Sequence, residues 1–436
     1  MQPTTEPVAP RVSARSIRTI AVVGLGYVGL PLAILAENRG YAVRGYDIDA
    51  NKIAALGKRK APFLSAEEAA RLASSRIRMS TDAAVLAGAD AYIVCVPTPV
   101  DEEHTPDLRP LVSAARSVGR HLTRGALVVI ESTVNPGACE AVALPVLERE
   151  SGLRVREDFF FAHCPERINP GDPTWTVGTI PRVMGASDPE SLVKATELYQ
   201  EILDATIVPM DSIKEAEAVK MVENAFRDVN IAFVNELAMS FARAGIDIEH
   251  VIRGAATKPF GFMSHFPGCG GGGHCIPVDP YYLIRYGEEN GFEHRFLKTA
   301  RAINEGMPAY TLSLLEEVLE RPLAGAKIAL LGLSYKRDVP DLRESPALVI
   351  RDLLKAHGAH VRIYDPLLPG ESNVKDLEAA LTGADAALIA TNHTAFMEVT
   401  PATLKAHGVD AVVDGRNCLD KVAFLASGIR YRGVGR

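Results

Sequence analysis

Short apolar runs alternate with longer amphipathic stretches through the first half of this 436-residue chain. The runs are TIAVVG at 19–24, YAVRGYD at 41–47, AYIVCV at 91–96, ALVVIES at 126–132 and FFFAHC at 159–164. Strands that alternate with helical stretches build parallel βαβ units. Ligands of such open sheets gather beyond the carboxyl ends of the strands. The alternation therefore predicts an α/β domain whose binding site lies where these strands end.

The segment GLGYVG at 24–29 follows the first apolar run and opens a helical stretch. In this pattern Gly24 permits a tight turn, Gly26 lets the backbone approach a pyrophosphate, and Gly29 packs helix on strand. The second run ends in Asp47, whose carboxylate can hold ribose hydroxyls and disfavours a 2′-phosphate. Together these residues predict a site for NAD rather than NADP, whereas the glycines alone would also fit a turn that binds nothing.

Residues 212–244 contain neither proline nor glycine, and apolar side chains recur among them at helical spacing. These are Val219, Val222, Phe226, Val229, Phe233, Leu237 and Phe241. The pattern predicts a helix of more than average length, of the kind that joins domains or forms a subunit interface, so a homodimer is expected. Lys220 and Asn224 share one face of this helix, either as a solvated edge or as site residues.

A second α/β pattern begins near Arg321 and repeats the first one. ADAALIAT at 384–391 resembles ADAYIVCV at 89–96. Arg416 follows a later apolar run and suits a phosphate or a surface turn. The expected fold is therefore α/β, with two Rossmann-like doubly wound domains joined by a long central helix. The expected parts are a disordered tail at 1–16, a dinucleotide-binding domain at 17–210, a central helical domain at 211–320 and a Rossmann-like domain at 321–436.

Composition excludes several classes of protein. The formal net charge of −7 argues against nucleic acid as a main partner. No apolar run reaches the roughly 18 residues of a membrane span, and the first 16 residues lack the apolar centre of a signal peptide. The six cysteines are scattered and form no Cys-x-x-Cys pair, so reduced thiols and no metal site are expected. A cytoplasmic protein follows from these features.

Four consecutive glycines stand between Cys269 and Cys275 in PGCGGGGHCIPVDP at 267–280. A disulfide, a metal, a tight turn or a nucleophile would each explain a thiol at such a place. A glycine-rich loop lets backbone approach a ligand, and a thiolate there is a nucleophile if a nearby cation lowers its pKa. Combined with a dinucleotide site, the thiol indicates aldehyde oxidation through a thioester, although spacing alone leaves the alternatives open. Asp279 lies four residues further on.

These motifs resemble those of the UDP-glucose/GDP-mannose dehydrogenase family. In the family's order the chain carries GLGYVGLP, CVPTP, ESTVNPG, CPERINPG, KMVENAFRDVNIAFVNE, GGGGHCIPVDPYYL, GLSYKRDVPDLRESP and VVDGRN. The match runs from about Arg18 to Arg432. It implies that a sugar C6 alcohol becomes a carboxylate, with two NAD+ and one water, while the domain at 321–436 holds the UDP-sugar.

The resemblance also implies roles for single residues. Cys275 would attack the aldehyde, Lys220 and Asn224 would stabilise an oxyanion, and Asp279 would assist proton transfer. Glu166 and Thr133 would position or activate water. The implied NAD contacts are Gly24, Gly26, Tyr27, Val28, Gly29, Asp47, Lys52, Thr98, Thr133 and Arg343, the last from the far domain. The implied substrate contacts are Glu166, Arg167, Lys220, Asn224, Lys258, Gly272, His274, Lys336 and Arg416, with Lys336 and Arg416 on the diphosphate and Lys258 from a neighbouring subunit.

The choice of sugar depends on smaller differences. HCIPVDP at 274–280 is similar to the UDP-N-acetylhexosamine group, because Val278 replaces a lysine of many UDP-glucose enzymes. AATKPFGF at 255–262 and TIPRVMG at 179–185 look most like UDP-N-acetylglucosamine enzymes, so this sugar is the expected substrate. CPER and ENAFRDVNIAF are shared with UDP-N-acetylmannosamine enzymes, which keeps the manno epimer open.

Two further hypotheses accompany this expectation. The rival from another class is a non-redox protein, either an epimerase that keeps NAD bound or a nucleotide-sugar-binding protein. The second hypothesis concerns Cys269, which stands where relatives usually have proline. It puts a second thiol in the glycine loop, so a reversible Cys269–Cys275 disulfide is conceivable.

Overall fold

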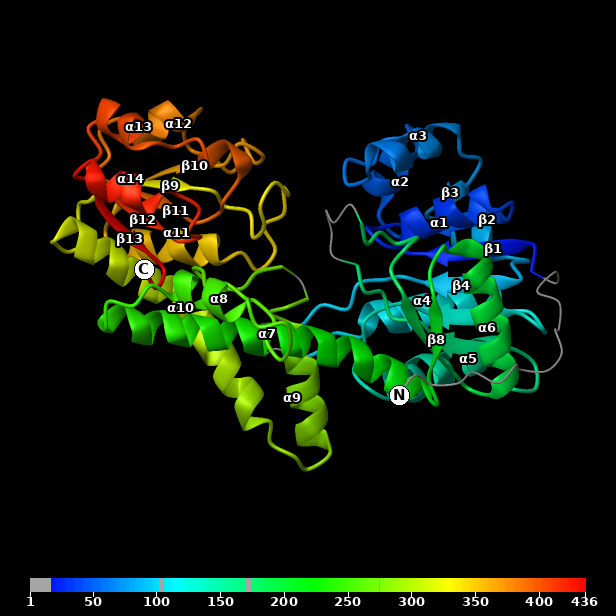
Figure 1. Ribbon diagram of the computed structural model, residues 1–436. Coiled ribbons are helices and arrows are strands. Elements are labelled where there is room, and N and C mark those ends of the chain that lie inside the picture. Colours follow the sequence, from blue (N-terminus) through cyan, green and yellow to red (C-terminus); the bar gives the residue numbers. More distant parts are fainter. Residues whose placement is uncertain (1–16, 102–104, 169–173, 274) are drawn as a thin grey trace. The chain divides into compact units, whose positions relative to one another are not determined.

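The structure, a computed structural model, describes residues 17–101, 105–168, 174–273 and 275–436 (Figure 1). The expected tail at 1–16 lies outside these residues. The chain divides into two compact units, the first ending at Val222 and the second beginning at Glu223. One helix, α7 (Ile213–Arg243), contributes to both units. It confirms the long helix predicted at 212–244.

The first unit contains a sheet of eight strands and the helices that cover it. The strands are β1 (Thr19–Val23), β2 (Ala42–Tyr46), β3 (Arg78–Ser80), β4 (Ala91–Val94), β5 (Leu127–Ile130), β6 (Phe160–His163), β7 (Arg182–Ala186) and β8 (Ile207–Pro209). The helices are α1 (Gly29–Asn38), α2 (Ala50–Gly57), α3 (Ala66–Ser74), α4 (Arg109–Gly119), α5 (Leu144–Ser151) and α6 (Pro189–Ile202). A 3₁₀ turn at Ala83–Leu86 and a π-helical turn at Cys139–Ala143 complete it.

The strand order of this sheet is β3-β2-β1-β4-β5-β6-β7-β8. The five strands predicted from apolar runs are β1, β2, β4, β5 and β6, and they pair in parallel. Strand β7 runs antiparallel to β6, which no apolar run indicates. Because of this reversal, the amino end of β7 lies beside the carboxyl ends of β5 and β6.

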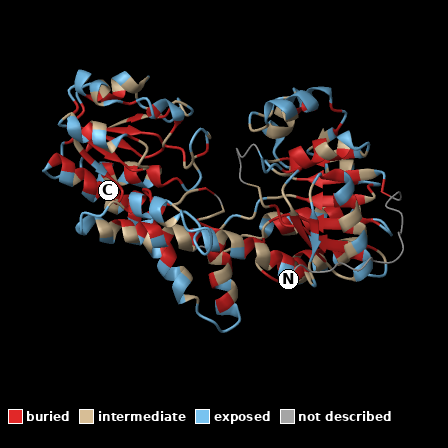
Figure 2. Cartoon of the chain, viewed as in Figure 1, coloured by how far each residue is buried: buried red, intermediate tan, exposed pale blue. Residues whose placement is uncertain are grey.

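Helices cover both faces of the first sheet because successive residues of a buried parallel strand face opposite sides. Ile20 and Val22 of β1 belong to a core that includes residues of α1 and α6. Ala21 and Val23 belong to a second core that includes residues of α4 and α5. Figure 2 shows the buried residues concentrated along the strands. The first expected doubly wound domain is therefore confirmed.

The second unit contains an all-parallel sheet of five strands. Its strands are β9 (Lys327–Leu331), β10 (His360–Tyr364), β11 (Ala386–Ile389), β12 (Ala411–Asp414) and β13 (Arg430–Gly433). Besides part of α7, its helices are α8 (Ile248–Ala255), α9 (Asp279–Glu289), α10 (Arg295–Leu319), α11 (Pro346–Ala356), α12 (Leu377–Leu381), α13 (Pro401–Ala406) and α14 (Lys421–Ala426). A 3₁₀ turn spans Thr394–Phe396.

The strand order of the second sheet is β10-β9-β11-β12-β13. In this order β11 lies next to β9 as β4 lies next to β1, which confirms the similarity of ADAALIAT and ADAYIVCV. Alternate residues of β9 again enter two cores. Ile328 packs in a core with residues of α10 and α11, and Ala329 packs in a core with residues of α12, α13 and α14. The second expected doubly wound domain is thereby confirmed as well.

The apolar residues predicted along α7 are only partly buried. Val222, Phe226 and Phe233 are exposed by 57%, 50% and 53%, respectively. Met221 and Ala225, which lie elsewhere around the helix, are buried instead. An apolar stripe of α7 therefore faces outward in the single chain. Among the described residues, no helix combines the length and apolar character needed to cross a membrane.

Candidate active site

The turn between β1 and α1 uses its three glycines for different reasons. Gly24 has a φ of 91°, and a Cβ there would lie 2.6 Å from the Cys95 carbonyl oxygen. A Cβ at Gly29 would overlap the Gly24 carbonyl oxygen. A Cβ at Gly26 would meet none of the described heavy atoms within 4 Å. Space beside the Gly26 backbone is what the close approach of a phosphate needs.

Asp47 lies directly after β2, next to this turn. Its Oδ2 accepts hydrogen bonds from the Leu25 N–H at 2.9 Å and from Lys52 Nζ at 2.6 Å. Its Oδ1 accepts one from the Asp49 N–H at 3.0 Å. Burial by itself would raise the pKa of the Asp47 carboxyl, but these hydrogen bonds lower it. The carboxylate is therefore ionised and fixed beside the glycine turn, which fits the ribose of a dinucleotide.

The loops after β4 and β5 meet because these two strands are neighbours. Thr98 Oγ1 donates a hydrogen bond to the Thr133 carbonyl oxygen at 2.5 Å. Tyr27, in the turn before α1, packs its ring against Phe63 with centroids 4.7 Å apart, and Val28 is the residue that precedes α1. The structure thus places Thr98 and Thr133 together at the carboxyl edge of the sheet.

Glu166 follows β6 at the same edge and is buried. Its Oε1 accepts hydrogen bonds from the N–H groups of Arg167 at 2.6 Å and Ile168 at 2.7 Å. Its Oε2 forms an ion pair with Arg182 Nη2 at 2.5 Å. Arg167 directs Nη1 to the Pro181 carbonyl oxygen at 3.0 Å. Two backbone N–H groups and the Arg182 guanidinium therefore fix the position of Glu166. Sequence reasoning missed this role of Arg182, because TIPRVMG at 179–185 contains Arg182 but does not show which side chain it meets.

Asn224, Asp279 and Cys275 come together in the second unit. Asn224 Nδ2 on α7 donates a hydrogen bond to Asp279 Oδ2 at 2.5 Å. Asp279 is the first residue of α9, and its N–H donates to the Cys275 carbonyl oxygen at 2.8 Å. Asp279 is buried, whereas Cys275 is partly exposed. Lys220, one turn earlier on α7, is buried within the first unit.

The glycine stretch before Cys275 packs against its own unit. A Cβ at Gly272 would lie 2.6 Å from Tyr335 Cβ, and a Cβ at Gly273 would lie 2.8 Å from the Tyr335 ring. The Gly273 N–H also donates to the Arg343 carbonyl oxygen at 3.0 Å. Side chains at Gly272 and Gly273 would collide with Tyr335. Close packing within the second unit therefore explains these two glycines without any ligand. A Cβ at Gly271 would face open space among the described residues.

Cys269 and Arg416 share one acceptor. Cys269 Sγ donates to the Ala390 carbonyl oxygen at 3.3 Å, and Arg416 Nε donates to the same oxygen at 2.9 Å. The Cys269 side chain is fully buried, and its N–H donates to the Gly415 carbonyl oxygen at 3.1 Å. Neither Cys269 nor Cys275 forms a disulfide in this structure. Burial of Cys269 gives an oxidant little access, which weighs against the Cys269–Cys275 disulfide.

The remaining expected contacts lie on loops of the second unit. Arg343 Nε and Nη2 bind the Asp341 carboxylate at distances from 2.6 to 3.1 Å, so this arginine has a partner in its own loop. Lys336 lies in the same loop and is partly exposed. Lys258 is exposed. His274 lies outside the described residues.

A buried polar chain between α7 and α10 anchors the glycine stretch. The Gly268 N–H donates to Asn235 Oδ1 at 3.1 Å, and Asn235 Nδ2 donates to Asn304 Oδ1 at 2.9 Å. Asn304 Nδ2 and Arg301 Nη1 both donate to Asp228 Oδ1, at 2.8 and 2.7 Å. Sequence reasoning missed these residues. The sequence does show that these polar residues occur on long, largely apolar helices. It does not show that they are buried, because burial depends on how the helices pack.

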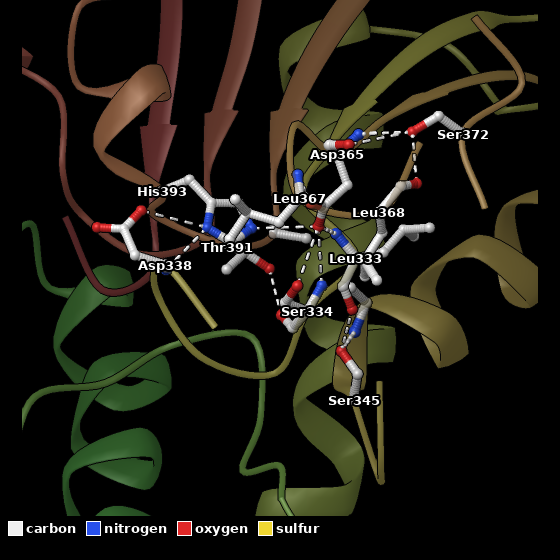
Figure 3. Close-up of polar contacts among 12 residues, drawn as sticks. Leu333, Ser334, Asp338, Ser345, Asp365, Leu367, Leu368, Ser372, Thr391 and His393 are labelled. Atoms are coloured by element: carbon white, nitrogen blue, oxygen red, sulfur yellow. Dashed lines mark hydrogen bonds and ion pairs between the residues drawn. The ribbon is translucent and has the colours of Figure 1, made fainter. Parts of the chain in front are cut away.

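Figure 3 shows a second buried network, at the carboxyl edge of the second sheet. Asp365 Oδ2 accepts hydrogen bonds from the N–H groups of Leu333 at 2.7 Å and Ser334 at 3.1 Å, and from His393 Nε2 at 3.1 Å. His393 Nδ1 accepts the Asp338 N–H at 2.9 Å. Because a backbone N–H can only donate, Nδ1 is the acceptor and Nε2 is the ring nitrogen that donates to Asp365.

Asp365 corresponds to Asp47 of the first unit. Each aspartate follows the second strand of its unit and accepts an N–H from the turn after the first strand. In the second unit His393 occupies the outer side of the carboxylate, which leaves Asp365 fully buried. The end of the second sheet thus has the same arrangement of strand, turn and aspartate as the first sheet. In the second unit, however, the His393 side chain takes the place beside the carboxylate.

Comparison with known proteins gives the following similarities. Models of the UDP-glucose/GDP-mannose dehydrogenase family match the chain in three parts: the NAD binding domain at 18–203, the central domain at 214–306 and the UDP binding domain at 329–421. A UDP-N-acetyl-D-glucosamine 6-dehydrogenase of Pseudomonas aeruginosa is 41% identical over 386 residues, covering 86% of this chain and 91% of that protein.

A second relative covers more of the chain at slightly lower identity. A UDP-N-acetyl-D-mannosamine dehydrogenase of Pyrococcus horikoshii is 38% identical over 427 residues, covering 96% of this chain and 99% of that protein. A solved structure of a UDP-D-ManNAc dehydrogenase from Pyrococcus horikoshii superposes with a TM-score of 0.89 at 37% identity. It covers 96% of this chain and 99% of that chain.

Proposed function

Because this chain belongs to the UDP-glucose/GDP-mannose dehydrogenase family, we propose that it oxidises the C6 alcohol of UDP-N-acetylglucosamine to a carboxylate. The chain is an NAD-dependent nucleotide-sugar dehydrogenase. The observation that carries the choice of sugar is the 41% identity to the Pseudomonas aeruginosa UDP-N-acetyl-D-glucosamine 6-dehydrogenase. The balanced reaction turns one alcohol, two NAD+ and one water into one carboxylate, two NADH and three protons.

The glycine turn of the first unit would hold NAD. The open space at Gly26 suits the pyrophosphate, and the ionised Asp47 suits the ribose. Bound NAD+ supplies the hydride acceptor for both oxidation steps. The further contacts proposed for it are Gly24, Tyr27, Val28, Gly29, Lys52, Thr98, Thr133 and Arg343.

Cys275 is the proposed nucleophile of the second oxidation. Its thiolate adds to the aldehyde carbon and the carbonyl oxygen gains a proton, which gives a thiohemiacetal. Loss of a hydride and of the hydroxyl proton from this adduct then gives a thioester. Lys220 and Asn224 stabilise the negative oxygen that forms on the way. The hydrogen bond from Asn224 to Asp279 supports this role, because it fixes the amide beside the Cys275 turn.

Hydrolysis of the thioester completes the reaction. Water attacks the carbonyl carbon, the carbon–sulfur bond breaks, and Cys275 leaves as a thiolate. We assign the positioning of this water to Glu166 and Thr133. The three donors on Glu166 support a fixed carboxylate for this purpose.

The substrate's nucleotide end would be held by basic side chains. Lys336 and Arg416 are proposed for the diphosphate, and both belong to loops at the carboxyl edge of the second sheet. Arg167, Lys258, Gly272 and His274 complete the proposed substrate contacts.

UDP-N-acetylmannosamine is the second candidate substrate. The Pyrococcus horikoshii relative favours it, because that protein covers 96% of this chain and superposes with a TM-score of 0.89. A single contact at C2 separates the two sugars, and pockets often discriminate such differences weakly. The test is to measure NADH formed per sugar consumed with UDP-N-acetylglucosamine, UDP-N-acetylmannosamine and UDP-glucose.

Each outcome of this measurement decides one point. Two NADH per UDP-N-acetylglucosamine supports the thioester route and the gluco sugar. Turnover with only the manno epimer keeps the mechanism and changes the substrate. One NADH per sugar means that the reaction stops at the aldehyde, which contradicts the roles of Cys275 and Glu166. No net NADH with any sugar contradicts the redox function and favours an epimerase or a binding protein.

Three further features belong to this proposal. The domains are proposed at 17–210, 211–320 and 321–436, and the three family-model ranges support these limits. A homodimer or higher homo-oligomer is proposed because Val222 and Phe226 of α7 are exposed. A cytoplasmic location is proposed because a reducing compartment keeps the Cys275 thiol available.

A further inference from the structure

The ion pair between Glu166 and Arg182 belongs to a larger buried charged cluster in the first unit, which includes a second carboxyl group without a role so far. Its members are Glu131, which follows β5; Glu166, which follows β6; and Arg182, which begins β7. The reversal of β7 brings these three chain segments to the same edge of the sheet. The Arg182 side chain is inaccessible to solvent, and both carboxylates are buried. We call this group the Glu131–Arg182–Glu166 cluster.

The two carboxylates of the cluster are not equivalent. Glu166 receives two backbone N–H hydrogen bonds on Oε1 and the Arg182 ion pair on Oε2. Glu131 Oε1 accepts a hydrogen bond from the Tyr199 hydroxyl at 2.5 Å. Glu131 Oε2 lies 3.6 Å from Arg182 Nη1, whereas Glu166 Oε2 lies 2.5 Å from Arg182 Nη2.

Charge balance then selects the carboxyl that holds a proton. One guanidinium faces two carboxyl groups in a space without solvent, and an excess buried negative charge is costly. A single proton removes this excess. It belongs on Glu131, because Arg182 lies 2.5 Å from Glu166 but 3.6 Å from Glu131, and Glu166 also accepts two backbone N–H hydrogen bonds.

The other titratable groups around the cluster agree with this assignment. Burial raises the pKa of Glu131 to about 7, with Arg182 opposing the rise and Glu166 adding to it. Burial also raises the pKa of the Cys95 and Cys164 thiols well above their usual values, so both stay neutral. Besides its own members Arg182 and Glu166, the groups that face the cluster are Tyr199, Cys95, Cys164 and Arg167.

We propose that Glu131 is a positioning residue that controls, through Arg182, how strongly Glu166 is held. While Glu131 carries its proton, Arg182 pairs with Glu166 alone and occupies Glu166 Oε2. When Glu131 loses the proton, its carboxylate competes for Arg182, and Glu166 becomes a stronger hydrogen-bond acceptor for water. This inference rests on the proposed role of Glu166 in thioester hydrolysis.

The kinetic test isolates hydrolysis from the oxidation steps. The full-length enzyme is mixed with excess NAD+ and less than one equivalent of UDP-N-acetylglucosamine for a single turnover, quenched at intervals, and the acyl-Cys275 intermediate is followed by intact-protein mass spectrometry. In the wild type the decay of this intermediate should speed up about tenfold between about pH 6 and about pH 8, as expected for one ionisation centred between them. In Glu131→Gln the decay should vary less than about twofold over the same range.

Two further variants separate this effect from general damage. Tyr199→Phe removes a donor that favours the ionised form of Glu131, so the increase should move to higher pH. Glu217→Gln is the matched control, because Glu217 is also buried with its pKa raised to about 7 but binds the N–H groups of Gly137 and Cys139 instead. This control should keep the wild-type pH dependence. An unchanged pH dependence in Glu131→Gln would overturn the proposal.

An infrared measurement tests the proton without any turnover. Difference spectra recorded between acidic and alkaline buffer should show the carbonyl bands of protonated buried carboxyls. Glu131→Gln should lose one component of this signal and Glu217→Gln another, because both carboxyls have a pKa raised to about 7. If Glu131→Gln retains the whole wild-type signal, the proposal is wrong even when two NADH form per sugar. If the Glu131 component is present but the wild type forms only one NADH per sugar, the proposed role of Glu166 in hydrolysis is wrong. The proposed effect of Glu131 on Glu166 is then wrong too, whereas the presence of a proton on Glu131 is still supported.

Discussion

At the residue scale, two glycines of one turn face opposite surroundings. Gly26 borders open space, whereas Gly29 touches the backbone of Gly24. Gly26→Ala should therefore leave the fold intact and weaken NAD+ binding by at least about tenfold, because the methyl group enters the space proposed for phosphate. Gly29→Ala should lower the free energy of unfolding by about 1–3 kcal/mol or more. Urea unfolding and calorimetric titration with NAD+ measure the two effects, and equal NAD+ affinity in Gly26→Ala and the wild type would contradict the proposed site.

The thiol of Cys275 is the second feature at this scale. Cys275→Ala should lower the rate of acid formation by about 10³-fold or more while UDP-sugar binding stays within about threefold, because only the nucleophile is lost. Cys275→Ser should release aldehyde slowly and form no acid. Cys418→Ala is the control, since Cys418 is also a partly buried cysteine outside any disulfide but lies after β12. Two NADH per sugar in Cys275→Ala would exclude the thioester route.

At the element scale, the first and second strands of both sheets end in the same arrangement. A turn N–H binds Asp47 in one unit and Asp365 in the other, but only Asp365 is sealed by a histidine. Burial by itself would raise the pKa of Asp365, yet the hydrogen bonds from His393, Leu333 and Leu367 lower it strongly. The carboxylate therefore joins β9, β10 and the turn after β11 into one structure.

Asp365→Asn should lower the free energy of unfolding by about 2–4 kcal/mol at neutral pH, because an amide cannot accept all of these hydrogen bonds. The folded pKa of Asp365 lies below the unfolded value, so its stabilisation is present above about pH 4 and is lost as the pH falls. The difference between the wild type and the variant should shrink accordingly in acid. Urea titrations at several pH values measure it, with the exposed Asp352→Asn as a control expected to cost less than about 1 kcal/mol. A difference that grows in acid would contradict this account.

At the scale of the whole molecule, the exposed stripe of α7 bears on assembly. Phe226 and Phe233 are half exposed on a helix that both units share. The double variant Phe226→Ser, Phe233→Ser should shift the protein to smaller species by at least about tenfold in dissociation constant, because the apolar area proposed to bind a second copy is lost. Light scattering after size exclusion over a range of concentrations measures this shift. Val422→Ser, on exposed α14, is the control, and an oligomer that resists the double variant would place the interface elsewhere.

The sequence by itself determined the local elements and the chemistry at their ends. The strands β1, β2, β4, β5 and β6 lie where apolar runs predict them, because burial on both faces demands continuous apolar residues. The helix at 212–244 and the glycine turn follow from residues close together in the chain. Cys275 and Asp279 likewise belong to one short segment. These features depend on local spacing, which a sequence displays directly.

Only the tertiary structure decided which distant residues meet. Arg182 reaches Glu131 and Glu166 because β7 runs against β6, and no local pattern encodes the order or direction of strands. The hydrogen bond between Asn224 and Asp279 joins positions 55 residues apart. Packing also decided that apolar side chains of α7 stay exposed while polar side chains of the same helix are buried. Such contacts depend on how all the helices and strands pack together. A short stretch of sequence shows which residues are available but not which distant residues they will meet.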